Sequence, residues 1–251
     1  MTATMPTEIP ESRAAAGPTA AARAARTIPG TRAAGDPMTR DQLFLWDLVH
    51  GAMRHHSRVV QRVIGEIRPG DVAAARQLAD FWGRMRAEIV NHHRIEDTVF
   101  FPGLLAVAPE FAAMDEHLGR DHDSLDVALE DLALRLDDLV RSGASSVARR
   151  AAVEAATVVA DLLHDHLERE EGAVFPIFLT TMTASTYAEL DEEAALLVDK
   201  KELPFIAPWL LAHATAEQTE RLYAAAPSVV KLLHKVFWRR AYVRAFPLLD
   251  A

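Results

Sequence analysis

The sequence lacks cysteine, and this absence removes several functional classes. A chain of 251 residues without Cys has no disulfide framework, no thiolate zinc or iron–sulfur site and no cysteine nucleophile. Any bound metal ion must therefore be held by histidine and carboxylate side chains. The absence of cysteine also fits a cytoplasmic location, which we expect for this chain.

Long apolar runs and excess positive charge are missing too. No stretch of about 18 apolar residues is present, so we expect no membrane span. The N-terminus has no hydrophobic segment of the kind found in secretory signals. The net charge is −9, and an acidic chain is a poor match for the nucleic-acid backbone. We therefore expect neither a membrane nor a nucleic acid as partner.

The scarcity of β-branched runs and of Asn-Gly or Asp-Gly turns argues against strands, whereas Ala, Leu, Arg and Glu are abundant. The expected fold class is all-α. Residues 1–37 are rich in Ala, Pro, Thr, Gly and Arg and have almost no large apolar side chain, so we expect a disordered tail.

Residues 38–182 carry apolar residues at helical spacing in four long segments with short connections, which predicts an up-down-up-down four-helix bundle. Pro102 is expected to kink or end the second helix after Phe101, and Phe-Pro is expected to end the fourth helix at Phe175. The four expected helices cover residues 41–67, 71–101, 109–140 and 145–175.

Residues 183–251 differ from the preceding region because prolines divide them into shorter helical stretches, expected over 184–199, 208–225 and 228–242. The apolar residues around Trp209 and Phe237 need a surface to cover them. We expect this C-terminal helical extension to pack against the bundle or to mediate self-association or binding of a protein partner.

The strongest functional signal is a duplicated motif. His92 and Glu96 precede one Phe-Pro pair, and His166 and Glu170 precede a second one at the same distance. Residues i and i+4 share one face of a helix, so each segment aims one imidazole and one carboxylate at the same point. Two such helices facing each other would supply two nitrogens and two oxygens. This donor set suits a pair of redox metals, with iron favoured and zinc or manganese as alternatives.

Further ligands are expected from the first and third helices. His50 and His122 are the best candidates, because each lies near an inward apolar stripe of its helix. His117 lies about 140° from His122 around the helix and would ligate only if the helix rotates or loosens there. His55, His56, His93 and His164 are expected to face elsewhere, and His213 and His234 are interpreted as ordinary histidines.

These residues resemble those of hemerythrin-like proteins with an HHE cation-binding domain. The resemblance covers about residues 40–180 and rests on His50, the two His-x-x-x-Glu elements and the segment around His122. It implies a non-heme di-iron centre in a four-helix bundle, with His50, His92, His122 and His166 as terminal ligands and Glu96 and Glu170 as bridges. Oxygen-carrying members have a second histidine on the third helix, where this chain has Leu118. This departure is expected either to leave one iron with an open position or to recruit His117.

The leading interpretation is therefore a di-iron protein that binds O2, peroxide or nitric oxide for sensing, scavenging or iron handling. A peroxide-consuming di-iron enzyme is one alternative. A metal-stabilised interaction protein, which would use residues 183–251 to bind a partner, is the other.

Overall fold

The structure, a computed structural model, describes residues 35–249, and the regular secondary structure in this range consists of helices and one isolated bridge between Pro37 and Thr183. The predicted all-α class is confirmed for this part of the chain. Residues 1–34, which make up most of the predicted tail, lie outside the described residues. None of the described helices is both long enough and apolar enough to cross a membrane.

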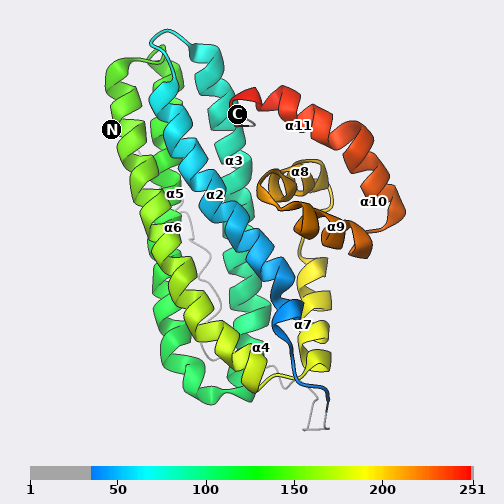
Figure 1. Cartoon of the computed structure of the whole chain (residues 1–251). Coiled ribbons are helices and arrows are strands. Elements are labelled where there is room, and N and C mark those ends of the chain that lie inside the picture. The colour runs from blue at the N-terminus through cyan, green and yellow to red at the C-terminus, as the bar shows by residue number, and fades with distance from the viewer. Residues whose placement is uncertain (1–34, 250–251) are drawn as a thin grey trace, which may run out of the picture.

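Four long helices lie side by side and run alternately up and down (Figure 1). Consecutive helices pack on each other, and α2 also packs against α6, which closes the arrangement. Asp71 and Ser145 begin the second and fourth of these helices, where their side chains accept hydrogen bonds from the backbone N–H groups of Ala74 and Ala148. The four helices are α2 (Phe44–Glu66), α3 (Val72–Ile95), α5 (Ala112–Arg141) and α6 (Ser146–Thr180).

The expectation that Phe-Pro ends two helices was wrong. After Ile95 the chain continues through a π-helical turn, η2 (Glu96–Phe100), directly into α4 (Phe101–Val107). Pro102 lies in the first turn of α4, directly after the π-helical turn. Pro176 lies inside α6, which runs on to Thr180. Both prolines are therefore accommodated within continuous helical segments.

The interior consists of two separate apolar cores. The large core includes Met53, Ile89, Leu125 and Leu163, and the small core includes Trp46, Val99, Leu118 and Val174. On each of the four chain segments, the sequence-predicted ligand positions lie between a residue of one core and a residue of the other. The fold therefore places a polar layer between two dry layers.

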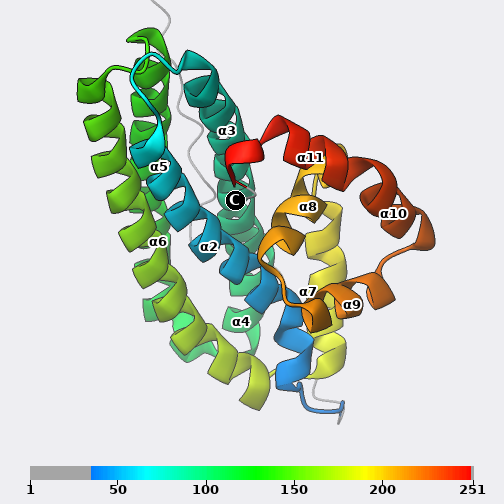
Figure 2. The same ribbon diagram turned by 45° about the horizontal axis from the view of Figure 1, so that its top comes forward.

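The extension covers one side of the long helices (Figures 1 and 2). Phe205, Trp209 and Phe246 belong to the same large core as α2 and α3, so the extension packs against the long helices. The single helix predicted over 208–225 is instead two, because α8 ends at His213 and Thr215 caps the next helix. Its helices are α7 (Ala184–Leu196), α8 (Leu203–His213), α9 (Ala216–Ala225), α10 (Ser228–Leu233), the π-helical η4 (His234–Trp238) and α11 (Arg239–Ala245).

Three short 3-10 turns complete the described chain. They are η1 (Arg40–Leu43) before α2, η3 (Pro109–Phe111) before α5, and η5 (Pro247–Leu249) at the C-terminal end. The helix predicted to begin at residue 109 therefore starts with the turn η3 and continues as α5.

Candidate metal centre

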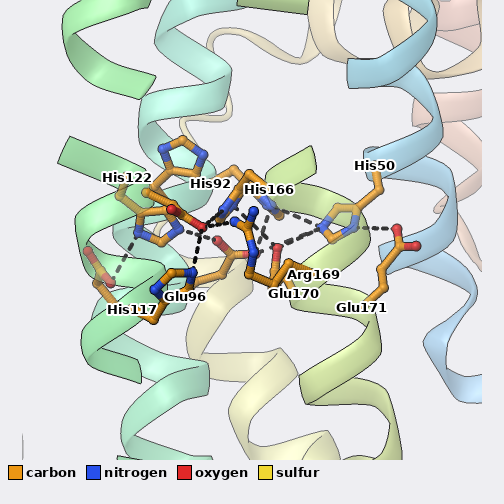
Figure 3. Close-up of polar contacts among 12 residues, drawn as sticks. His50, His92, Glu96, His117, His122, His166, Arg169, Glu170 and Glu171 are labelled. Carbon is orange, nitrogen blue, oxygen red and sulfur yellow. Dashed lines mark hydrogen bonds and ion pairs between the residues drawn. The ribbon is translucent and has the colours of Figure 1, made fainter. Parts of the chain in front are cut away.

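Six of the seven predicted ligands converge between the two cores (Figure 3). Each long helix contributes, and the helical spacing explains how: the residues of each His-x-x-x-Glu element lie one turn apart on the inward face. Two groups of potential ligands result, and within each group the ligand atoms lie within 4.8 Å of one another. One group consists of His50, His92, Glu96 and Glu170, and the other of His93, His122 and His166.

Glu96 lies between the two groups. Its Oε1 atom is 2.7 Å from Nε2 of His92, while its Oε2 atom is 3.6 Å from Nε2 of His122. Glu170 is similarly shared, because its Oε2 atom lies 3.6 Å from Nε2 of His166 and 3.8 Å from Nε2 of His50. Both carboxylates thus face imidazoles of both groups.

The residues fit a bound cation, as their unsatisfied polar atoms show. Both carboxylate oxygens of Glu170 and both ring nitrogens of His166 are buried without a hydrogen-bond partner. Burying such atoms unpaired costs free energy, so native structures rarely leave several of them together. Coordination to metal ions would satisfy these atoms, and the nitrogen and oxygen donors are those that iron, manganese or zinc accept.

An outer set of carboxylates faces the opposite side of three imidazole rings. Nδ1 of His50 donates a hydrogen bond of 2.8 Å to Glu171, which also accepts one of 2.7 Å from Arg54. Asp97 lies 3.3 Å from Nδ1 of His122. A proton held at Nδ1 leaves Nε2 unprotonated and available for a metal ion. The hydrogen bond to Glu171 therefore selects, at His50, the tautomer that a metal site needs, and the position of Asp97 favours the same tautomer at His122.

The third outer carboxylate belongs to Asp121, which lies 3.7 Å from Nδ1 of His166 and pairs with Arg169 (Figure 3). Glu171 and Asp121 are thus each held by an arginine. The Glu171–His50 contact crosses from α6 to α2, and the Asp121–His166 contact crosses from α5 to α6. The outer carboxylates therefore also tie neighbouring helices together around the layer.

Electrostatics in this layer shift the pKa values of the two shared carboxylates in opposite directions. Burial raises the pKa of Glu170 well above its usual value, and the nearby Glu96 adds to the effect. Burial also opposes ionisation of Glu96, but the adjacent His92 and His50 outweigh it and lower the pKa of Glu96. Burial, with the neighbouring His122 and His93, lowers the pKa of His166 to about 2. Burial also lowers the pKa of His92 and of His93, so these imidazoles stay in the neutral form that binds metals. At His50 and His122 burial is outweighed by the neighbouring carboxylates, and the pKa is raised.

His117 is the one predicted ligand that the structure does not bring into either group. Its side chain is 43% exposed, and its Nε2 atom lies 4.0 Å from Asp121. Leu118 beside it is fully buried in the small core, so α5 faces the layer with His122 and turns His117 toward solvent. The rotation that would recruit His117 does not occur in this structure.

His93 takes part instead, and the expectation that it faces elsewhere was wrong. Its ring stacks on that of His122 with 4.2 Å between centroids, and lies edge-on to His166 at 5.4 Å. Adjacent residues on a helix point about 100° apart, so His92 and His93 reach the two different groups. The doubled His92-His93 pair was the signal in the sequence, but its meaning depends on which helices flank α3.

A helical protein with paired, buried histidine–carboxylate groups and no thiolate ligand belongs to the class of His/carboxylate metal-binding proteins. Residues 41–178, more than half of the chain, match the family model described as the hemerythrin HHE cation binding domain. The chain therefore belongs to the hemerythrin HHE family. No curated protein and no solved structure shows a significant match to the chain.

Proposed function

We propose that the protein is a non-heme di-iron hemerythrin-like protein that binds O2, peroxide or nitric oxide for sensing, scavenging or iron handling. The observation that carries this proposal is the position of Glu96, whose two oxygens face different groups of ligands. A single-ion site would not require a carboxylate shared in this way. In this proposal α2, α3, α5 and α6 form the up-down-up-down four-helix bundle of the family.

The proposed ligand set assigns roles to individual residues. His50 and His92 would serve the first ion, His93, His122 and His166 the second, with Glu96 and Glu170 shared between them. Iron is the favoured metal, because the family and the mixed nitrogen and oxygen donors both suit it, with manganese or zinc as the competing occupants. When bound, a pair of iron ions would supply redox chemistry and a coordination position for a small ligand.

The chain's own residues would control that chemistry through protons and water. Glu171 accepts a hydrogen bond from Nδ1 of His50, and Asp97 and Asp121 lie 3.3 Å and 3.7 Å from Nδ1 of His122 and His166. These carboxylates favour protons on the outward nitrogens and would leave the inward Nε2 atoms free. The two apolar cores on either side exclude bulk water from the layer. A dry surrounding strengthens electrostatic interactions within the layer.

Elemental analysis of the purified full-length protein, expressed with ample iron, tests this proposal. About two iron atoms per chain is the expected result, and addition of O2, peroxide or nitric oxide should then change the visible absorption spectrum. Zinc alone, or no metal under these conditions, would contradict the di-iron assignment and favour a structural role for the site.

A further inference from the structure

A cavity of about 290 Å³ lies between the long helices and the extension. The extension helices α7 and α8 form one wall, while α2, α3 and η2 form the other. Its volume corresponds to about ten water molecules, which is the size of a ligand with about ten non-hydrogen atoms. Its apolar lining comes from both walls and includes Trp46, Val49, Met53, Ile206, Trp209 and Leu210.

The cavity adjoins the candidate metal centre through His92. This residue lines the cavity and is also a member of the first ligand group. Its side chain is 14% exposed, whereas those of His50, Glu96 and Glu170 are 1% exposed or less. Trp46, another wall residue, lies edge-on to His92 with 6.2 Å between ring centroids. Access to the first group is therefore greatest from this cavity.

The carboxylates of the cavity wall make its charged groups acidic. Glu88 and Asp191 line it from opposite walls, and the described lining residues include no lysine or arginine. Burial raises the pKa of Glu88 to about 7, with the carboxylates of Glu202 and Asp199 adding to the effect. A cation placed beside Glu88 would compensate for the desolvation of this carboxylate.

The two tryptophans, Trp46 and Trp209, provide a second feature of the cavity, one from each wall. Indole rings attract cations through their electron-rich faces as well as offering a large apolar surface. Indole faces combined with carboxylates are the chemistry that recognises organic ammonium groups.

We propose that this cavity is a binding site for a small apolar amine, whose ammonium group pairs with the carboxylate of Glu88 or Asp191 and whose hydrocarbon part packs against Trp46 and Trp209. A bound amine would contact His92 and so cover the exposed side of the first ligand group. The site goes beyond the proposed binding of diatomic ligands or peroxide, and apart from His92 its walls are formed by residues outside both ligand groups.

Calorimetric titration of the full-length, metal-containing protein at pH 7.5 with 2-phenylethylamine tests the proposal. The neutral analogue 2-phenylethanol and the anion 3-phenylpropanoate have similar shapes and serve as matched ligands. The amine should bind at least tenfold more tightly than the alcohol, and the anion should show no measurable binding. Equal affinity for amine and alcohol, or no binding of the amine, would overturn the proposal.

Variants then assign the interaction to the acidic pair. Glu88→Gln should weaken amine binding at least tenfold and leave alcohol binding unchanged. Asp191→Asn, at an exposed position, gives the same test if the buried variant fails to fold. Glu192→Gln is the control, because Glu192 is exposed on the same helix and does not line the cavity. Amine binding that survives both acid variants would also overturn the proposal.

Metal content is measured on the same samples. Absence of iron would count against the di-iron function alone, whereas the amine titrations decide the cavity proposal by themselves. The two proposals can therefore fail separately.

Discussion

At the residue scale, the proposed centre depends most on Glu96, because each of its oxygens faces a different ligand group. Its side chain is 1% exposed, so water could not easily take the place of the carboxylate oxygens if they were removed. Removing it would leave the Nε2 atoms of His92 and His122 without their nearest anionic partner. Metal binding and stability should therefore be lost together at this position.

Glu96→Ala is expected to lose most of the bound metal and to destabilise the fold by about 1–3 kcal/mol for each buried polar group left unsatisfied. Elemental analysis and thermal unfolding measure the two effects. His213→Ala serves as the control, because His213 lies on α8 outside both ligand groups and should retain full metal content. Normal metal content in the Glu96 variant would refute the proposed site.

His93 and His117 give opposite predictions, which distinguish the observed geometry from the sequence-based one. His93→Leu should remove about one metal ion per chain, because it would leave His122 and His166 as the only histidines of the second group. His117→Leu should keep the full content, since its side chain is 43% exposed and outside both groups. Metal analysis measures both contents. Loss of metal from His117→Leu but not from His93→Leu would show that α5 rotates in the metal-bound protein.

At the element scale, the continuous segment α3–η2–α4 connects the site to its surroundings. The π-helical turn begins at Glu96, and the N–H of Phe101 bonds to the carbonyl of Glu96 five residues earlier. Such turns add one residue to a helix and often occur at functional sites. Beyond it, Gly103 permits a close approach, because a Cβ atom there would lie 2.6 Å from Leu190 of α7.

The extension is held to the long helices by α8, and Phe205 is its most buried anchor together with Trp209. Phe205→Ala should lower the free energy of unfolding by about 3–5 kcal/mol, because the ring contributes to the large core and its removal leaves a cavity. Urea unfolding followed by circular dichroism measures this loss. Leu196→Ala is the matched control: that side chain is 78% exposed, so a change below about 0.5 kcal/mol is expected. Similar losses in the two variants would contradict the described packing.

At the scale of the whole molecule, stability should depend on pH through His56. This residue of α2 is buried against the extension. Its ring lies 5.9 Å from that of Phe81 and 5.6 Å from that of Trp209. Burial in this apolar setting lowers the pKa of His56 to about 3. Between about pH 6.5 and pH 3 the unfolded chain therefore binds a proton that the folded protein does not. Stability attributable to His56 is full above this window and is lost as the pH falls through it.

The wild-type protein should therefore lose about 2 kcal/mol more than the His56→Phe variant between pH 8 and pH 5. Urea unfolding of metal-free samples at several pH values measures this difference without interference from metal release. Parallel curves for the two proteins would show that His56 is accessible to protons in the folded state.

The sequence by itself determined the helical class, the family and the candidate ligands that recur in the His-x-x-x-Glu elements. Periodicity fixes which residues share a helix face, so His92 with Glu96 and His166 with Glu170 follow from spacing alone. Asp71 and Ser145 likewise predict where their helices begin, because their side chains can cap a helix N-terminus.

Only the tertiary structure decided which face of each helix points inward and what lies opposite it. The choice between His93 and His117 depends on how α3 and α5 rotate against each other, and the burial of Leu118 fixes that rotation. The passage of the helices through Pro102 and Pro176 depends on packing that outweighs local propensity. The cavity beside His92 exists because α7 and α8 meet the long helices, and contacts between residues over a hundred positions apart leave no local pattern in the sequence.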